Sequence, residues 1–471
     1  MRDEQIQAEE RQSLPFGFGN DRKNSAKLTF KPEDHLPSAD AFGGGQQQHK
    51  DMEVGIAEKI ECLKHYDVLA MQRVVAILAW GRSGSVLLAS YFDGHEDVIS
   101  LPEICGWRLF EFFNRYRSLS LRDKLLAYPT FDPNVTRFFE GDFAISPAEY
   151  YAAAEAIVVF YRDWPPEFLE SRRAFFLFVH VAYNLALGRR PSNSNPLIVY
   201  AQHDWDNVSA QHLVDDFPQA KFLHTIRDPI SSCDRAYHAL LDTLAEQNIQ
   251  LPYSVLDFLT SKDLPQGGME GRSRAIRFED LHCDIAKTMR DLSDWLGLSY
   301  QPILLESTFN GIPYVIKSEG KIWSGPRLEA VQRRTRHLSR ADRALLFALF
   351  YENFEDWKYP CPKIFRHRIV RCGVVVSLLP FPMKTEIVGA SAILHRRIWP
   401  ALRRGNISRV IKSLVGIGLV RLKIMLLLVS VVFRRCVHRP RLVQVHRNEQ
   451  PLETGVPGGE KLGETNESGP G

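Results

Sequence analysis

The stretch that decides the fold runs from Val74 to Glu103 and reads VVAILAWGRSGSVLLASYFDGHEDVISLPE. It begins with a short apolar run, Val74 to Trp80, which is rich in β-branched residues and ends at Gly81. Continuous apolar runs of this length are typical of strands that are buried on both faces of a sheet. The sequence therefore predicts a central strand that is followed at once by a glycine-flanked turn.

The turn has the composition of an anion-binding loop and consists of Gly81, Arg82, Ser83, Gly84 and Ser85. Its glycines allow the backbone to curl so that successive amides point inward, and its hydroxyls and guanidinium are free to face the same point. Apolar residues then recur at helical spacing from Leu87 to Phe92, which predicts a helix N-terminus that favours a phosphate. The nucleoside-triphosphatase loop is excluded, because it needs a Gly-Lys-Ser/Thr ending. On these residues alone, an ordinary strand-to-helix turn remains the alternative.

The whole segment resembles the 5′-phosphosulfate loop of the sulfotransferase family, in the Arg-Ser-Gly-Thr-Thr-Leu-Leu form of its bacterial, carbohydrate and tyrosylprotein members. The likeness continues through Asp93–Val98 (DGHEDV) to Pro102 and Glu103. It implies that the loop binds 3′-phosphoadenosine 5′-phosphosulfate through Gly81, Arg82, Ser83, Gly84, Ser85 and Val86. One departure is Val86, which replaces the second threonine, so that one hydroxyl expected on the 5′-phosphate is missing.

A second motif, FPQAKFLHTIRDP from Phe217 to Pro229, resembles the family's Phe-Pro-Asp-Ala-Lys-Phe-Ile…Arg-Asp-Pro. The resemblance implies that Arg227 binds the 3′-phosphate of the cofactor. The family places a serine eight residues later, where this chain has Arg235. Either Arg235 contacts the phosphate through charge-assisted hydrogen bonds, or it is a surface residue and Ser231 or Ser232 supplies the hydroxyl.

Looser likeness extends the resemblance over roughly residues 73 to 360. The segment from Arg274 to Leu281 (RAIRFEDL) resembles a later strand of the family, and a helix is expected from Asp284 to Leu298. In the family's closing segment, Lys321 or Arg327 is a candidate for phosphate contact, and a solvated loop is the preferred alternative for each. The resemblance implies an α/β, P-loop-like sulfotransferase fold, with a central parallel sheet flanked by helices and a helical basic C-terminal extension.

Sulfuryl transfer depends on positioning and on charge stabilisation, as phosphoryl transfer does. The resemblance gives Arg82 the role of meeting negative charge on the leaving phosphate, with help from the loop amides. Two bases stay open for the acceptor proton. Glu103 matches the glutamate of the tyrosylprotein type and is preferred, whereas His203 is the alternative by analogy with the cytosolic small-molecule type. No metal is required.

Charge divides the chain into unlike parts. Its net charge of +3 hides 18 Lys and Arg residues against one acid between Lys363 and Arg447, while the rest carries 41 basic and 55 acidic residues. Opposite charge implies different partners. We expect a disordered or loosely docked arm over residues 1–50, the sulfotransferase domain over 51–365, a basic amphipathic membrane-associated extension over 366–445, and a disordered tail over 446–471.

The basic extension alternates apolar blocks with arginine pairs. A spanning helix over residues 413–433 would place Arg421 and Lys423 near its middle, at a cost of about 5 to 7 kcal/mol against about −4 to −8 kcal/mol from its fourteen Leu, Ile, Val and Phe residues. A helix lying in the interface avoids that cost and is preferred. A helical cap on the catalytic domain is the other alternative. Nucleic-acid binding is not expected, because the apolar blocks have no use there.

The predicted function is sulfuryl transfer from 3′-phosphoadenosine 5′-phosphosulfate to an acceptor hydroxyl of a glycan, glycolipid or other lipid-linked molecule. The N-terminus carries charges where a signal peptide needs an apolar core, and the seven cysteines show no spacing suited to zinc. We therefore expect a metal-free cytoplasmic enzyme that binds an anionic membrane surface peripherally through residues 366–445. The alternatives are a non-catalytic membrane-associated nucleotide-binding protein and a P-loop-type kinase.

Overall fold

The computed structural model describes residues 46–79, 83–106, 108–131, 138–202, 207–244, 271–318, 321–333 and 335–437, together with residues 253, 256 and 269. The strands are β1 (Val74–Ala79), β2 (Val98–Ser100), β3 (Leu197–Gln202), β4 (Lys221–Ile226), β5 (Ser273–Arg277), β6 (Thr308–Phe309), β7 (Ile312–Pro313), β8 (Val315–Ser318) and β9 (Lys321–Ser324). The helices up to β9 are α3 (Gln46–Leu63), α4 (Ser85–Ser90), α5 (Glu103–Gly106), α6 (Leu109–Arg115), α7 (Leu121–Ala127), η2 (Tyr128–Thr130), α8 (Pro147–Phe160), α9 (Pro166–Leu169), α10 (Arg172–Ala186), α11 (Asn207–Asp216), α12 (Pro229–Leu244), α14 (Phe278–Cys283), α15 (Ile285–Leu296) and η3 (Pro302–Leu305). Those after β9 are η4 (Leu328–Val331), α16 (Arg340–Leu349), α17 (Tyr351–Asp356), η5 (Lys363–Arg366), α18 (Arg368–Leu378), α19 (Lys384–Ile393), the π-turn η6 (Leu394–Ile398), α20 (Trp399–Arg403) and α21 (Ile407–Val437).

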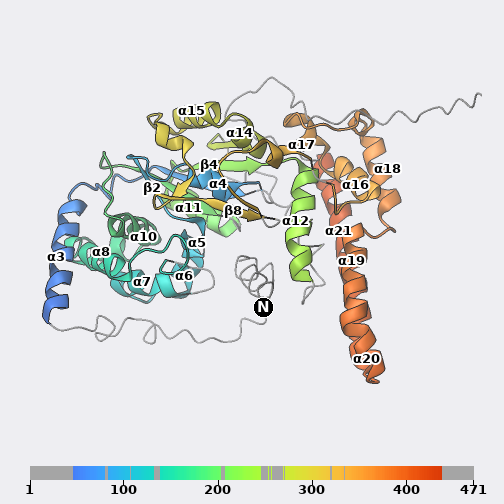
Figure 1. Ribbon diagram of the computed structural model, residues 1–471, viewed down its shortest axis with the longest axis horizontal. Helices are drawn as coiled ribbons and strands as arrows, with labels where there is room; N and C mark the ends of the chain where they lie inside the picture. Colours follow the sequence, from blue (N-terminus) through green and yellow to red (C-terminus); the bar gives the residue numbers. More distant parts are fainter. Residues whose placement is uncertain are drawn as a thin grey trace, which may run out of the picture.

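The described residues form a five-stranded sheet in the order β2-β3-β1-β4-β5, and every neighbouring pair in it is parallel. Helices cover both faces of the sheet (Figure 1). This architecture confirms the predicted α/β fold with a central parallel sheet. From β1 the chain runs to β2 and β3 on one side and then crosses to β4 and β5 on the other, so β1 marks the place where the strand order reverses. In open α/β sheets, ligands bind beyond the carboxyl ends of the strands at such a place.

Strand β1 is buried on both faces, as its apolar run predicts. Val74, Ala76 and Leu78 belong to an apolar cluster that includes residues of α6, α7, α8 and α10. Val75 and Ile77 belong to a second cluster, which includes residues of α4 and α15. Because side chains alternate across a strand, one uninterrupted apolar run fills both layers of the core.

Three boundaries differ from the sequence predictions. The expected strand from Arg274 to Leu281 ends at Arg277, whose guanidinium donates to Asp280 on the first turn of helix α14. Helix α4 ends at Ser90, because the next two amides make bonds to residues three positions earlier. Helix α3 begins at Gln46, inside the expected arm, and Lys59 of this helix forms an ion pair of 2.5 Å with Glu149 of α8.

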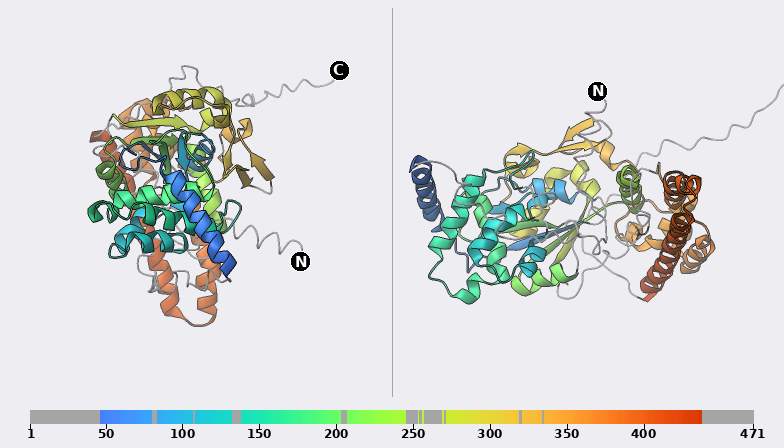
Figure 2. Two further views of the ribbon diagram at one scale, coloured as in Figure 1. Left: turned by 90° about the vertical axis from the view of Figure 1, so that its left-hand side faces the viewer. Right: turned by 90° about the horizontal axis from the view of Figure 1, so that it is seen from below.

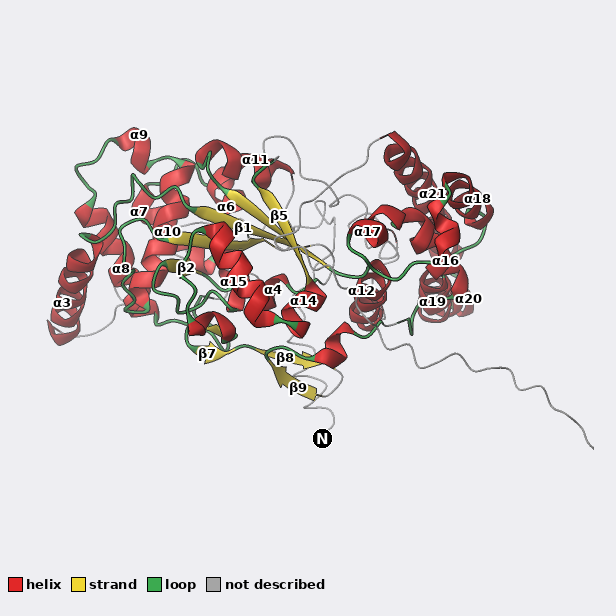
Figure 3. Cartoon of the chain, turned by 90° about the horizontal axis from the view of Figure 1, so that it is seen from above, coloured by secondary structure: helices red, strands yellow, loops and turns green. Residues whose placement is uncertain are grey.

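The basic extension folds into helices α18 to α21, which lie at one end of the molecule (Figure 3). Ile424, Leu428 and Val431 on one face of α21 are buried in an apolar cluster with residues of α12 and α16. Helices α19 and α20 follow one another along one arm, α21 forms the other arm, and both arms extend away from the sheet (Figure 2). In the described part of the chain, Ile407–Phe433 is long and apolar enough to cross a membrane, by length and composition, with a mean hydropathy of 2.3.

Candidate active site

Each candidate residue follows the carboxyl end of one strand of the parallel sheet in the chain. Parallel strands present their carboxyl ends on the same side. The residues that follow β2, β3, β1, β4 and β5 are, in this order, Glu103, His203, the Arg82 loop, Arg227 and Phe278. The strands before the two candidate bases therefore lie on one side of β1. The strands before Arg227 and Phe278 lie on the other side.

The described part of the phosphate loop is bonded to the neighbouring strand β4. The hydroxyl oxygens of Ser83 and Thr225 lie 2.6 Å apart, and both residues are buried. The sequence predicted a Ser83 hydroxyl that faces the anion. In the structure this hydroxyl can donate to a phosphate only when Thr225 supplies the proton of their shared bond, since a hydroxyl has a single proton.

Gly84 occupies a position that only glycine fits. Its φ of 83° lies in the left-handed region, which costs an L-residue energy. A Cβ at Gly84 would also lie 2.7 Å from Cδ2 of Phe278. The Phe278 ring therefore packs directly against the backbone of the loop.

Arg227 lies over the same aromatic ring. Its guanidinium carbon is 4.1 Å from the centroid of the Phe278 ring, which is a cation–π distance. Its Nη2 donates a hydrogen bond of 3.0 Å to the carbonyl oxygen of Ala330. Gly84 and Arg227, which belong to the two motifs singled out in the sequence, thus meet at one phenylalanine.

A strap formed by residues 327–333, which includes η4, crosses this region. Its residue Ala330 accepts the hydrogen bond from Arg227, and its residue Arg327 donates its backbone N–H to Nδ1 of His282 at 2.9 Å. The Arg327 guanidinium lies over the ring of Trp323 in β9. These contacts do not test the prediction that Arg327 contacts phosphate. They place the backbone of Arg327 beside His282, in the strap that also contacts Arg227.

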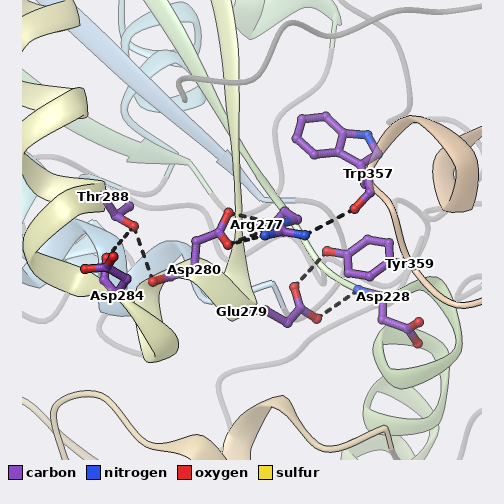
Figure 4. A network of polar contacts seen from close by, with 8 residues as sticks. All are labelled: Asp228, Arg277, Glu279, Asp280, Asp284, Thr288, Trp357 and Tyr359. Atoms are coloured by element: carbon purple, nitrogen blue, oxygen red, sulfur yellow. Dashed lines mark hydrogen bonds and ion pairs between the residues drawn. The ribbon is translucent and has the colours of Figure 1, made fainter. Parts of the chain in front are cut away.

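A buried carboxylate supports the end of β4 (Figure 4). Glu279 Oε1 accepts a hydrogen bond of 3.2 Å from the backbone N–H of Asp228, and its Oε2 accepts one of 2.7 Å from the Tyr359 hydroxyl. Burial raises the pKa of Glu279, while the positive charge of Arg227 acts in the opposite direction. Glu279 therefore anchors the backbone directly after Arg227.

Both carboxylate oxygens of Asp228 accept hydrogen bonds from other parts of the chain. Oδ1 accepts a hydrogen bond of 2.8 Å from the backbone N–H of Ser231 and so caps the start of α12. Oδ2 accepts one of 3.1 Å from Nε of Arg333 in the strap. Pro229 stands at the first helical position, where no N–H is needed. Asp228 thus joins the strap to the helix that follows Arg227.

Other predicted residues are placed only in part. Gly81, Arg82 and His203 lie outside the described residues, so their roles stay predictions. Glu103 begins helix α5, directly after β2 and Pro102, but its side chain lies outside the described part as well. The choice between Glu103 and His203 as the base therefore stays open.

The two departures from the family pattern lie on described helices. Val86 packs against the apolar cluster between α4 and α15, so this position contributes to the core. Arg235 lies half-buried on α12, and Ser231 and Ser232 are buried near the start of the same helix. These positions leave both alternatives for the phosphate contact open.

Sequence reasoning missed Phe278, Glu279 and His282. Their segment follows a predicted strand, and this was the available signal, because residues after the carboxyl ends of parallel strands share an edge. The prediction of one strand from Arg274 to Leu281 placed Phe278 and Glu279 inside the strand and so concealed that they lie beyond its carboxyl end. The arginine–phenylalanine and histidine contacts join segments far apart in the chain, so no local pattern announces them.

The site is rich in donors. The Arg227 guanidinium, the Ser83 hydroxyl and the His282 ring lie in it, whereas the carboxylates of Glu279 and Asp228 are engaged by backbone and side-chain donors. Such a set suits the phosphates of a nucleotide. Over the ranges that the structure describes, no group of three or more His, Cys, Asp and Glu residues is arranged to hold a metal.

Comparison with protein families agrees with a site that binds a nucleotide phosphate. A model of the sulfotransferase family matches residues 75–302. Solved structures similar to the chain include the sulfotransferase domain from the curacin biosynthetic pathway, with 15% identity and a TM-score of 0.32 over 50% of this chain and 77% of that one. The sulfotransferase domain from the Synechococcus PCC 7002 olefin synthase has 20% identity and a TM-score of 0.31 over 50% of this chain and 76% of that one. A sulfotransferase from Mycobacterium avium has 11% identity and a TM-score of 0.28 over 58% and 78%. No curated protein sequence matches the chain.

The family match spans the sheet, the phosphate loop and the Arg227 motif. Residues 75–302 therefore form a sulfotransferase family domain, and this domain indicates a sulfotransferase enzyme.

Proposed function

We propose that the protein transfers a sulfuryl group from 3′-phosphoadenosine 5′-phosphosulfate to a hydroxyl of a glycan, glycolipid or other lipid-linked acceptor. The observation that carries the proposal is the meeting of Gly84 and Arg227 at the Phe278 ring. The family resemblance assigns the loop to the 5′ end of the nucleotide and Arg227 to its 3′-phosphate. One nucleotide has both groups, so the two motifs need to lie close together.

The described residues fit such a nucleotide. Gly84 allows the left-handed turn of the loop, which brings the loop backbone against Phe278, and Arg227 is a buried cation over the same ring. When bound, the nucleotide supplies the activated sulfuryl group. In this proposal Ser83, Gly84 and Ser85 hold the 5′ end, together with Gly81 and Arg82.

The remaining tasks fall to residues at the same edge of the sheet. Arg82 stabilises negative charge on the leaving phosphate, and Glu103 accepts the proton of the acceptor hydroxyl, with His203 as the alternative base. The strands before Glu103 and His203 lie on the side of β1 opposite to β4. This arrangement favours an acceptor beside β2 and β3 and a nucleotide beside β4 and β5.

We also propose that the enzyme works at the cytoplasmic surface of a membrane, to which α21 binds. This helix is apolar on two faces. One face is buried in the protein, whereas the opposite face carries an outward stripe of exposed apolar side chains at helical spacing, which are Ile407, Ile411, Leu414, Val415, Leu419, Leu422, Leu426, Val429 and Phe433. An exposed apolar stripe of this length favours an apolar partner.

An ion pair neutralises Arg421, which is one of the two cations that make a membrane-spanning helix unfavourable. Arg421 Nη1 lies 2.7 Å from Glu386 Oε1 on α19, and its Nη2 donates to the carbonyl oxygen of Phe381 at 2.8 Å. The Lys423 amine lies 5.8 Å from the ring centroid of Tyr253. Both cations are therefore engaged with the protein beside the outward stripe, where they cost a membrane-bound helix less than in an isolated span.

Charge favours a lipid surface over a second copy of the chain as the partner of this stripe. Residues 391–433 carry eight Lys and Arg and no acidic residue. Two copies packed face to face would bring these like charges together, whereas anionic headgroups neutralise them. Burial of Ile424, Leu428 and Val431 in the protein core also favours a helix that lies in the interface over one that spans.

The enzymatic proposal is tested by nucleotide binding and transfer. A thermal shift with adenosine 3′,5′-bisphosphate at a hundred times its dissociation constant should add about 2.7 kcal/mol to stability. We expect ATP to give a smaller shift and Arg227→Ala to abolish the preference. A preference for ATP would favour a kinase. Nucleotide binding without transfer to any lipid-linked hydroxyl would favour the non-catalytic binding protein.

The membrane proposal is tested by sedimentation of the full chain with lipid vesicles. We expect binding to vesicles that contain phosphatidylserine, weaker binding to pure phosphatidylcholine, and loss of binding in the double variant Leu422→Gln/Leu426→Gln. Ile369→Gln is the matched control, because Ile369 is also exposed but lies on α18 outside the stripe. Equal binding by all variants would contradict the proposal. So would a dimer in solution that the double variant abolishes.

A further inference from the structure

His282 is buried in the site and bonded on one side only. Its Nδ1 accepts the backbone N–H of Arg327 at 2.9 Å, so in the neutral ring the proton is on Nε2. The residue is 7% exposed. Its ring packs edge-on against Phe278 at a centroid distance of 4.4 Å, so it touches the same phenylalanine as Gly84 and Arg227.

The Nε2–H group has no acceptor among the residues that the structure describes. No residue in the described part of the chain lies within hydrogen-bond distance of this buried atom. A buried donor without a partner costs about 1 to 3 kcal/mol, and native proteins rarely retain one without a reason. A bound ligand that supplies an acceptor is such a reason.

The surroundings of the ring select an anionic acceptor. Burial lowers the pKa of His282 to about 4, and the positive charges of Arg227 and Arg327 act in the same direction. The ring is therefore neutral near pH 7 and keeps the single Nε2–H as its donor. Two cations close enough to act on one neutral donor suit the negative charge of a phosphate.

We propose that His282 donates its Nε2–H to the 3′-phosphate of the bound nucleotide. This inference rests on the proposed function and adds a residue to it that the phosphate-loop and Arg227 motifs do not contain. The bond between Nδ1 and Arg327 orients the ring, so the strap formed by residues 327–333 sets the direction of the donor. His282 thereby contributes to the preference for a nucleotide that carries a 3′-phosphate.

Two substitutions separate the two nitrogen atoms of the ring. His282→Asn retains an acceptor near the Nδ1 position for the Arg327 N–H and removes the Nε2 donor. His282→Gln retains an amide donor near the Nε2 position and loses the acceptor. Isothermal titration of the full chain with adenosine 3′,5′-bisphosphate and with adenosine 5′-phosphate measures the part of the affinity that depends on the 3′-phosphate. Thermal melting without nucleotide shows whether each variant is folded.

We expect His282→Asn to reduce the preference for the 3′-phosphate by about tenfold or more, and His282→Gln to retain most of it. A ring that only supports the strap would give the reverse order, with the asparagine variant like the wild type, and this result would overturn the inference. If the wild type itself shows no preference for the bisphosphate, the proposed function fails. A wild-type preference that is unchanged in His282→Asn removes the role of His282 alone.

Discussion

Replacing Gly84 with alanine tests how closely the phosphate loop packs on Phe278. Two costs add up at this position. The left-handed backbone, with φ of 83°, costs an alanine about 1 to 2 kcal/mol. The new Cβ would lie 2.7 Å and 3.0 Å from two carbons of the Phe278 ring, and such overpacking costs about 1 to 3 kcal/mol. We expect Gly84→Ala to lower the free energy of unfolding by about 2 to 5 kcal/mol.

Gly141 offers a matched control. Its φ is 87°, close to that of Gly84, but a Cβ there meets no atom within 4 Å. Gly141→Ala should therefore cost only the backbone part, about 1 to 2 kcal/mol. Urea unfolding of both variants isolates the contact with the ring as the difference between them.

The same substitution should weaken nucleotide binding, because movement of Phe278 also removes the surface on which the Arg227 guanidinium lies. A second substitution, Phe278→Leu, should recover part of the stability lost in Gly84→Ala, since the two residues are in contact. Equal destabilisation by Gly84→Ala and Gly141→Ala, with no recovery in the double variant, would refute the close packing of the loop on Phe278.

Three further predictions concern the ionisable groups His282, Glu279 and Arg421. The pKa of His282 is lowered to about 4, so the folded state loses stability as the pH falls from 6.5 toward 4, and His282→Asn should remove about 3 kcal/mol of this pH dependence in urea unfolding. Burial raises the pKa of Glu279, so ionisation of its carboxyl group lowers the stability of the folded state as the pH rises above 4.5. The difference in free energy of unfolding between the wild type and Glu279→Gln should therefore grow as the pH rises. Tyr359→Phe is the control, because it keeps the carboxyl group. Arg421→Met leaves the carboxylate of Glu386 without its cation and should cost about 3 to 5 kcal/mol, most of which Arg421→Met/Glu386→Gln should recover; no recovery would contradict the ion pair.

Local patterns predicted the elements that carry the site. The apolar run that begins at Val74 predicted the central strand, and it is buried on both faces. The helix expected from Asp284 to Leu298 is α15, and Gly297 caps its end in the left-handed conformation, as glycine does without strain. These features depend on residues that are close in sequence, where spacing and backbone preference act directly.

Helix α21 shows the limit of such patterns. Its composition allowed a membrane span, an interfacial helix or a cap on the domain, because composition does not say which face meets which neighbour. In the structure, Ile424 and Leu428 are buried against the domain, while Leu422 and Leu426 are 50% and 62% exposed. The buried face matches the cap, and the outward stripe is left for the membrane that we propose.

The sequence by itself determined the central strand and the glycine-flanked turn through an apolar run and glycine spacing, and the resemblance of two local motifs to the sulfotransferase family implied the parallel α/β fold and the position of Arg227. Only the tertiary structure decided that Gly84, Arg227 and His282 share the Phe278 ring, that Glu279 holds the backbone after Arg227, and that Arg421 pairs with Glu386. The physical reason is that these contacts join side chains from different strands and helices, and their distances depend on how the sheet and the strap pack.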